Sequence, residues 1–245
     1  MAPPPPIIAV VEVIGPAQQG LSQPLLCRGE DGQHYYVKGQ QTNRASLWSE
    51  WICAHLGQAL GLPLAPFALL QLDEALVREL PRDWQAVGSL PAFGSCEQRH
   101  VTWLEPGIRH KVAPQLQRQL LAFDWWVRNP DRLHGNTNLL WSVEREALVV
   151  IDHNLAFSSC FDAVEFSTQH VFAEQWSLLT GDLVEQAHHA QWLHSALGAA
   201  TQAMATAPEE WLWENSELDI PARFDTAQAL RLLERCATAD FWRTE

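Results

Sequence analysis

The sequence predicts an α+β fold with a β-rich N-terminal part and a mainly helical C-terminal part. Two patterns support this prediction. Residues 7–38 contain β-branched and apolar runs separated by turn residues, which is typical of strands. Residues 181–204 and 225–236 instead repeat apolar side chains at helical spacing. Pro and Gly break the pattern at residues 104–107, so we divide the chain into residues 1–104 and 105–245.

The N-terminal part is expected to form a sheet and one long helix. Ile7–Ile14 indicates a first strand, and the polar loop Gly15–Pro24 follows it. Leu25–Arg28 and His34–Lys38 are typical of a hairpin, because a Gly-Glu-Asp-Gly turn separates them. Ala45–Leu60 has a helical apolar stripe and ends at a Gly followed by a Pro. Further strand candidates are Leu64–Leu72 and Phe93–Trp103.

The C-terminal part begins with an amphipathic helix, Pro114–Arg128, which leads into an Asn-Pro-Asp-Arg turn. Asp124 lies one turn before this loop and is expected either to hold the loop or Arg132, or to be a partly exposed helix acid. Residues 138–141 and 148–151 are typical of a short hairpin. Further helices are expected at Gly181–Met204 and Asp225–Cys236.

Charge and cysteine content exclude several classes of function. The net charge is −13, with 16 basic against 29 acidic residues, which argues against nucleic acid or an anionic membrane as the main partner. The five cysteines are widely spaced and form no CxxC motif, which disfavours a zinc site or a disulfide framework. No signal-peptide pattern and no apolar run of transmembrane length is present. These features predict a cytoplasmic protein with reduced thiols.

Three polar residues between Phe123 and Phe157 indicate phosphoryl transfer. Asp131 and Asn136 share a loop, and Asp152 ends the strand-like run that follows. Transfer from Mg·ATP needs one carboxylate at the acceptor hydroxyl, and an amide oxygen and a second carboxylate at the metal. A D-x-x-x-x-N spacing alone is a weak signal, because all three residue types are common in loops.

The motifs DRxxxN, NLL and IDH together resemble the catalytic segment of HipA-like kinases. That family shares the protein-kinase-like fold with phosphatidylinositol kinases, and the order of elements fits over most of this chain. The resemblance implies two lobes, ATP and Mg²⁺ as cofactors, Asp131 as the catalytic residue, and Asn136 and Asp152 as metal ligands. The sequence departs from the family pattern at Leu133, where a His is usual; His134 follows it, and this shift removes support for a role of His134.

The resemblance also assigns the ATP lysine. Lys38 ends a predicted strand and is one of only two lysines in the chain. By resemblance it contacts the α- and β-phosphates and pairs with Glu50 on the long helix. The alternatives are an exposed lysine at a strand edge and a solvated Glu50.

The loop containing Gly20 and Ser22 is expected to lie over the nucleotide phosphates. HipA-like toxins carry a phosphorylatable serine in the equivalent loop, so Ser22 is a candidate autophosphorylation site. A phosphate on Ser22 would oppose nucleotide binding, because it adds negative charge where the ATP phosphates are expected. The alternative is an ordinary turn serine.

Three functions fit these observations. The first is a serine/threonine kinase with a protein as phosphoryl acceptor, the second a small-molecule or lipid kinase, and the third a catalytically silent nucleotide-binding scaffold. HipA-like toxins often carry an added N-terminal subdomain and bind an antitoxin. This chain is expected to start directly on the kinase lobe, and an antitoxin-like protein is a candidate partner.

Overall fold

The computed structural model describes residues 5–17, 23–215 and 217–244. The chain divides into two compact units that are interleaved along the sequence. The first unit contains residues 1–51, 65–99 and 205–224, and the second contains residues 52–64, 100–204 and 225–245. The predicted boundary between functional lobes at residues 104–105 stays a prediction.

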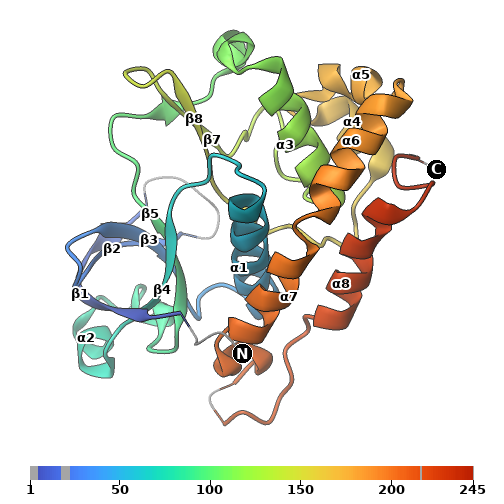
Figure 1. Cartoon of the computed structure of the whole chain (residues 1–245). Coiled ribbons are helices and arrows are strands. Elements are labelled where there is room, and N and C mark those ends of the chain that lie inside the picture. Colours follow the sequence, from blue (N-terminus) through green and yellow to red (C-terminus); the bar gives the residue numbers. More distant parts are fainter. Residues whose placement is uncertain (1–4, 18–22, 216, 245) are drawn as a thin grey trace. The chain divides into compact units, whose positions relative to one another are not determined.

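The first unit is built on a closed five-stranded barrel in the order β1-β2-β3-β5-β4 (Figure 1). Four neighbouring pairs are antiparallel, and the parallel pairing of β1 with β4 closes the barrel. The strands are β1 (Ile7–Pro16), β2 (Leu25–Gly29), β3 (His34–Lys38), β4 (Phe67–Gln71) and β5 (Ala92–Cys96).

Alternation along the strands determines which side chains fill the barrel. Leu25 pairs with Val37 and Cys27 with Tyr35, and all four are buried in one apolar cluster. On β5, a Cβ at Gly94 would lie 2.0 Å from Leu70 Cδ1, so only glycine leaves room for that core side chain. The predicted hairpin of β2 and β3 is confirmed.

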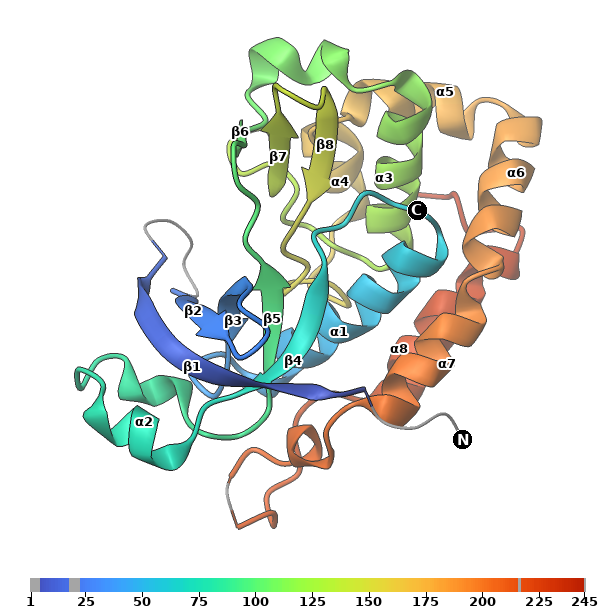
Figure 2. The same cartoon turned by 60° about the vertical axis from the view of Figure 1, so that its left-hand side comes forward.

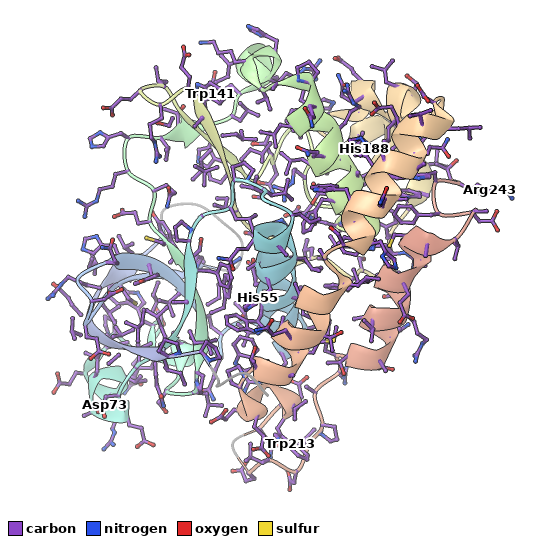
Figure 3. The ribbon with its side chains drawn as sticks, in the orientation of Figure 1. His55, Asp73, Trp141, His188, Trp213 and Arg243 are labelled. Atoms are coloured by element: carbon purple, nitrogen blue, oxygen red, sulfur yellow. The ribbon has the colours of Figure 1, made fainter. Side chains whose placement is uncertain are left out.

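Two short helices and one long one accompany the barrel. The short ones are α2 (Glu74–Glu79), capped by Asp73 (Figure 3), and a 3₁₀ turn at Gln85–Val87; the sequence pattern had not indicated either. The predicted long helix is confirmed as α1 (Arg44–Ala59), which begins in the first unit and ends in the second. Asn43 Oδ1 accepts a hydrogen bond from Ser46 N at 2.7 Å and so caps the helix.

The second unit combines a three-stranded sheet with helices (Figure 2). The sheet order is β6 (Thr102–Trp103), β7 (Leu139–Ser142), β8 (Ala147–Val150), and the predicted hairpin of β7 and β8 is confirmed. The α-helices are α3 (Pro114–Trp126), α4 (Ala163–Gln169), α5 (Trp176–Thr180), α6 (Leu183–His194), α7 (Leu197–Thr206, whose end passes into the first unit) and α8 (Thr226–Glu234). Short 3₁₀ helices of this unit are Pro106–Lys111, Ala173–Gln175 and Arg235–Ala237, whereas the 3₁₀ helix Glu209–Leu212 belongs to the first unit.

The helix expected over Gly181–Met204 is two helices, which corrects that prediction. Asp182 accepts hydrogen bonds from Val184 N and Glu185 N, so α6 begins only at Leu183. Ser195 donates its hydroxyl to Trp192 O at 2.6 Å where α6 ends. Within the described part of the chain, no helix is long and apolar enough to cross a bilayer. The α+β class is confirmed.

Candidate active site

The loop after α3 is held by the backbone and side chain of Asn129. Arg128 has φ +50°, so the chain leaves the helix through the left-handed region. Asn129 N then donates to Asp124 O at 2.9 Å, and Asn129 Oδ1 accepts from Asp131 N at 3.3 Å. These bonds close a short turn at Pro130 and present Asp131 at its end.

Asp124 and Arg132 form a buried ion pair beneath this loop. Both side chains are fully buried, and Arg132 Nε lies 2.6 Å from Asp124 Oδ2. Asn129 Nδ2 donates to Asp124 Oδ1 at 3.0 Å. Burial alone would raise the pKa of Asp124, but the Arg132 charge and a hydrogen bond from His170 hold that pKa well below its usual range. Of the alternatives for Asp124, the structure therefore shows the contact with Arg132.

His170 supports the same carboxylate as a neutral ring. Its Nδ1 accepts from Phe172 N at 3.1 Å, so the ring proton is on Nε2, which donates to Asp124 Oδ2 at 3.1 Å. Burial lowers the pKa of His170 despite the neighbouring Asp124 carboxylate, in agreement with a neutral ring.

Arg132 also joins the loop to the end of β8. Its Nη1 donates to the carbonyl oxygens of Thr137 at 3.2 Å, Asn138 at 2.8 Å and Ile151 at 3.4 Å. Its Nη2 donates to His153 Nε2 at 3.0 Å. One buried guanidinium thus contacts the backbone on both sides of the β7–β8 hairpin, directly beside Asp152.

The Asp131 carboxylate accepts two amide hydrogen bonds. Asn136 Nδ2 donates to its Oδ2 at 3.1 Å, and Asn138 Nδ2 donates to the same oxygen at 2.9 Å. Partial burial raises the pKa of Asp131, the two amides oppose this rise, and the charge of Asp152 adds to it. The structure therefore brings together Asp131, Asn136 and Asp152, as the sequence predicts, and adds Asn138.

Asp152 is the second residue after β8 and has φ +58°, in the left-handed region that Asp and Asn tolerate best among non-glycine residues. Asn138, with φ +48°, sits opposite, and its carbonyl accepts from Ile151 N at 3.1 Å. Carboxylate and amide oxygens are ligands that suit Mg²⁺. Among the described residues no group of three or more His, Cys, Asp or Glu could hold a metal. The roles of Asn136 and Asp152 as metal ligands stay predictions.

In the first unit, Lys38 and Glu50 form a buried ion pair. Lys38 Nζ donates to Glu50 Oε1, and the two side chains are 8% and 4% exposed. Lys38 ends β3 and pairs there with Phe93 on β5. The structure thus excludes an exposed lysine and a solvated Glu50, the two alternatives from the sequence. Gly20 and Ser22 lie outside the described residues.

A family model described as HipA-like kinase matches residues 10–245, almost the whole chain. The chain belongs to the HipA-like kinase family. This membership confirms the protein-kinase-like fold and a kinase-type phosphotransferase. No match was found among curated protein sequences.

Solved kinases are also similar to this HipA-like kinase at low identity. The proinflammatory kinase CtkA of Helicobacter pylori has 11% identity and a TM-score of 0.49, with 94% of each chain covered. The Golgi casein kinase with Mn/ADP bound has 11% identity and a TM-score of 0.44, covering 96% of this chain and 74% of the other. A second structure of the Golgi casein kinase has 11% identity and a TM-score of 0.45, covering 97% and 74%.

Sequence reasoning assigned no role to three contributors to the site, Asn138, His153 and His170, although the NLL and IDH motifs contain Asn138 and His153. For Asn138 a signal existed, because the run Asn136-Thr137-Asn138 places two amides at a spacing of two, on the same side of an extended chain. No signal existed for His170, because it lies 46 residues from Asp124 and nothing in the sequence between them indicates that the two side chains meet.

Proposed function

We propose that this protein is an ATP- and Mg²⁺-dependent kinase that phosphorylates serine or threonine in a protein acceptor. The observation that best supports it is the Asp131 carboxylate, which accepts two amide hydrogen bonds beside Asp152 in a HipA-like kinase. A kinase needs a fixed carboxylate at the acceptor hydroxyl, and the two amides fix this one.

In this proposal, Asp131 orients the acceptor hydroxyl and accepts its proton. Its Oδ2 is engaged by both amides. The amides favour the ionised carboxylate, which is the form that can accept a proton, and so limit the rise of the Asp131 pKa that burial causes.

The residues suited to the metal are Asn136 and Asp152. When bound, Mg²⁺ neutralises charge that develops on the transferred phosphoryl group. Asn136 donates its Nδ2 to Asp131, which leaves its Oδ1 as the atom suited to a metal. Arg132 keeps the backbone at Asp152 in place through the Ile151 carbonyl.

Lys38 is the proposed phosphate ligand. Glu50 orients the ammonium and balances its charge in a buried site, where an isolated Lys would lose its proton more readily. Ser22 is proposed as an autophosphorylation site that opposes nucleotide binding. The resemblance to HipA-like toxins is its support, and a phosphopeptide map without modification at Ser22 after incubation with Mg·ATP would exclude it.

The remaining proposals concern the setting of the reaction. Cys27, Cys53, Cys96, Cys160 and Cys236 are all free thiols, which fits a reducing compartment, and we propose a cytoplasmic location. An antitoxin-like partner stays a prediction of the family resemblance.

Transfer of labelled γ-phosphate from ATP tests the function. The wild type is expected to label itself or a protein fraction in the presence of Mg²⁺. Asp131→Asn is expected to abolish labelling, while Asp83→Asn, which alters an exposed acid, keeps it. Label appearing only in small molecules or lipids would refute the protein-kinase assignment, and equal labelling by Asp131→Asn would refute its catalytic role.

A further inference from the structure

The direction in which Glu50 points depends on how α1 is rotated about its axis. Successive residues of an α-helix are about 100° apart around the axis, so a small rotation would carry Glu50 away from Lys38. Something must therefore fix the rotation of the N-terminal half of this helix. The contacts of Trp48 and Trp51, on either side of Glu50 in sequence, show what does so.

Trp48 and Trp51 both pack against Trp211, which lies about 160 residues further along the chain. The ring centroids of Trp48 and Trp211 are 6.1 Å apart, and those of Trp51 and Trp211 are 6.2 Å apart, both in edge-on geometry. Trp48 Nε1 also donates to Trp211 O at 3.0 Å. Because two side chains three positions apart meet the same indole, that face of α1 has a fixed direction.

Residues 205–224, which we call the strap, begin at the last turn of α7 and belong to the first unit. Besides Trp211, the strap contacts α1 at two points. Arg44 Nε donates to Trp213 O at 2.8 Å, and Phe224 stacks on Trp48 with centroids 5.7 Å apart. Figure 3 labels Trp213 in this segment. The strap therefore holds α1 at its first turn and again beside Glu50.

Trp211 also contacts the strand system that carries Lys38. Its Nε1 donates to Pro91 O at 2.7 Å, one residue before β5 begins. β5 in turn pairs with β3, where Phe93 is the partner of Lys38. The Trp211 carbonyl thus accepts a hydrogen bond from the helix of Glu50, and the fully buried Trp211 indole donates to the residue just before the strand beside Lys38.

We propose that Trp211 is a positioning residue for the Lys38–Glu50 pair, and that the strap keeps this pair assembled when no nucleotide is bound. Trp211 does not touch substrate. It acts by keeping α1 and β5 in one fixed relation, so that Lys38 is ready for a nucleotide phosphate. The functional part of this inference rests on the proposed role of Lys38, whereas the structural part does not.

The test uses the rarity of lysine in the chain. Reductive ¹³C-methylation of the purified protein labels two lysines, Lys38 and Lys111, and the terminal amine. Lys111→Arg assigns the Lys38 resonance, and Glu50→Gln gives its position without the carboxylate. Trp211→Phe removes the hydrogen-bond donor to the Pro91 carbonyl and makes the ring smaller. Arg44→Met removes the hydrogen bond from α1 to the Trp213 carbonyl of the strap. Trp242→Phe, at a buried tryptophan of the second unit, is the matched control.

The Lys38 resonance in Trp211→Phe and in Arg44→Met is expected to move towards its position in Glu50→Gln, and to stay at the wild-type position in Trp242→Phe. The KM for ATP in Trp211→Phe is expected to rise about fivefold with little change in kcat, equivalent to one lost hydrogen bond of about 1 kcal/mol.

An unchanged Lys38 resonance in a folded Trp211→Phe or Arg44→Met protein would overturn the positioning role. If the resonance moves but the wild type transfers no phosphate, the proposed function fails and the structural inference stands. A resonance that moves equally in Trp242→Phe would show a general loosening of the fold and would also overturn the proposal.

Discussion

Replacing Arg132 by Met should be among the most damaging single changes in the second unit. The side chain is fully buried and donates to Asp124, to three backbone carbonyls and to His153. Met fills a similar volume but donates nothing, so the Asp124 carboxylate is left buried with Asn129 and His170 as its side-chain donors. Breaking a buried pair in this way costs about 3–5 kcal/mol of unfolding free energy.

The same change should reverse the pH dependence that Asp124 contributes. In the wild type, the pKa of Asp124 lies below its unfolded value, so this carboxylate stabilises the protein above that value and the contribution is lost as pH falls. Without Arg132, burial remains and the guanidinium is gone, so the folded pKa should rise above the unfolded one. The variant should then gain stability relative to wild type as pH falls from 7 to about 4.5 and Asp124 binds a proton.

Urea unfolding of both proteins at several pH values measures these differences. Arg78→Met is the matched control, because Arg78 pairs with Glu74 on the surface, both side chains being 75% exposed. That control should lose about 0.5 kcal/mol or less. A loss of unfolding free energy below about 1 kcal/mol in Arg132→Met, or a loss that does not become smaller at acidic pH, would refute this reasoning. It would show that the buried Asp124 carboxylate without its partner is not the main cause of the destabilisation.

Three further outcomes are expected. Asn138→Ala removes an amide that opposes the raised pKa of Asp131, so the acidic limb of the rate profile should move to higher pH, whereas an unmoved limb would separate Asn138 from the reaction. The pKa of His170 is lower in the folded than in the unfolded protein, so its contribution to stability is present above pH ~6.5 and is lost as pH falls. His170→Gln should therefore flatten the decline of the unfolding free energy between pH 7.5 and 5.5. An equal decline in the variant would show that another group takes up the proton. Glu50→Gln should raise the KM for ATP more than it lowers kcat, and an unchanged KM would contradict the assigned role of the Lys38 pair.

The sequence predicted the elements that carry the site because their signals are local. The hairpin before Lys38, the helix of Glu50 and the Asn-Pro-Asp turn at Asp131 each depend on neighbouring residues, and the structure has all three. The break of the helix at Ser195 was missed, because the apolar stripe continues across it and the break is marked only by hydrogen bonds of Ser195, such as that from its hydroxyl to Trp192 O.

The long-range contacts could not be predicted in the same way. Trp211 meets Trp48 across 163 residues, and His170 meets Asp124 across 46. His170 follows the seven-residue helix α4, and Trp211 lies in a four-residue 3₁₀ helix, so neither segment is long enough for its apolar pattern to indicate a distant partner. Contacts at such separations depend on how the elements pack against one another. Hydrophobic periodicity in a single sequence indicates local secondary structure and does not show this packing.

The most direct test of the central claim is a thermal melt with and without Mg·ATP, in wild type and in Asp152→Asn. A ligand at about 100 times its Kd adds ~2.7 kcal/mol to the stability of the folded state. We expect a rise in Tm that needs Mg²⁺ as well as ATP and is lost in Asp152→Asn. No rise in the wild type over a wide range of ATP, or an equal Mg²⁺-dependent rise in Asp152→Asn, would contradict it.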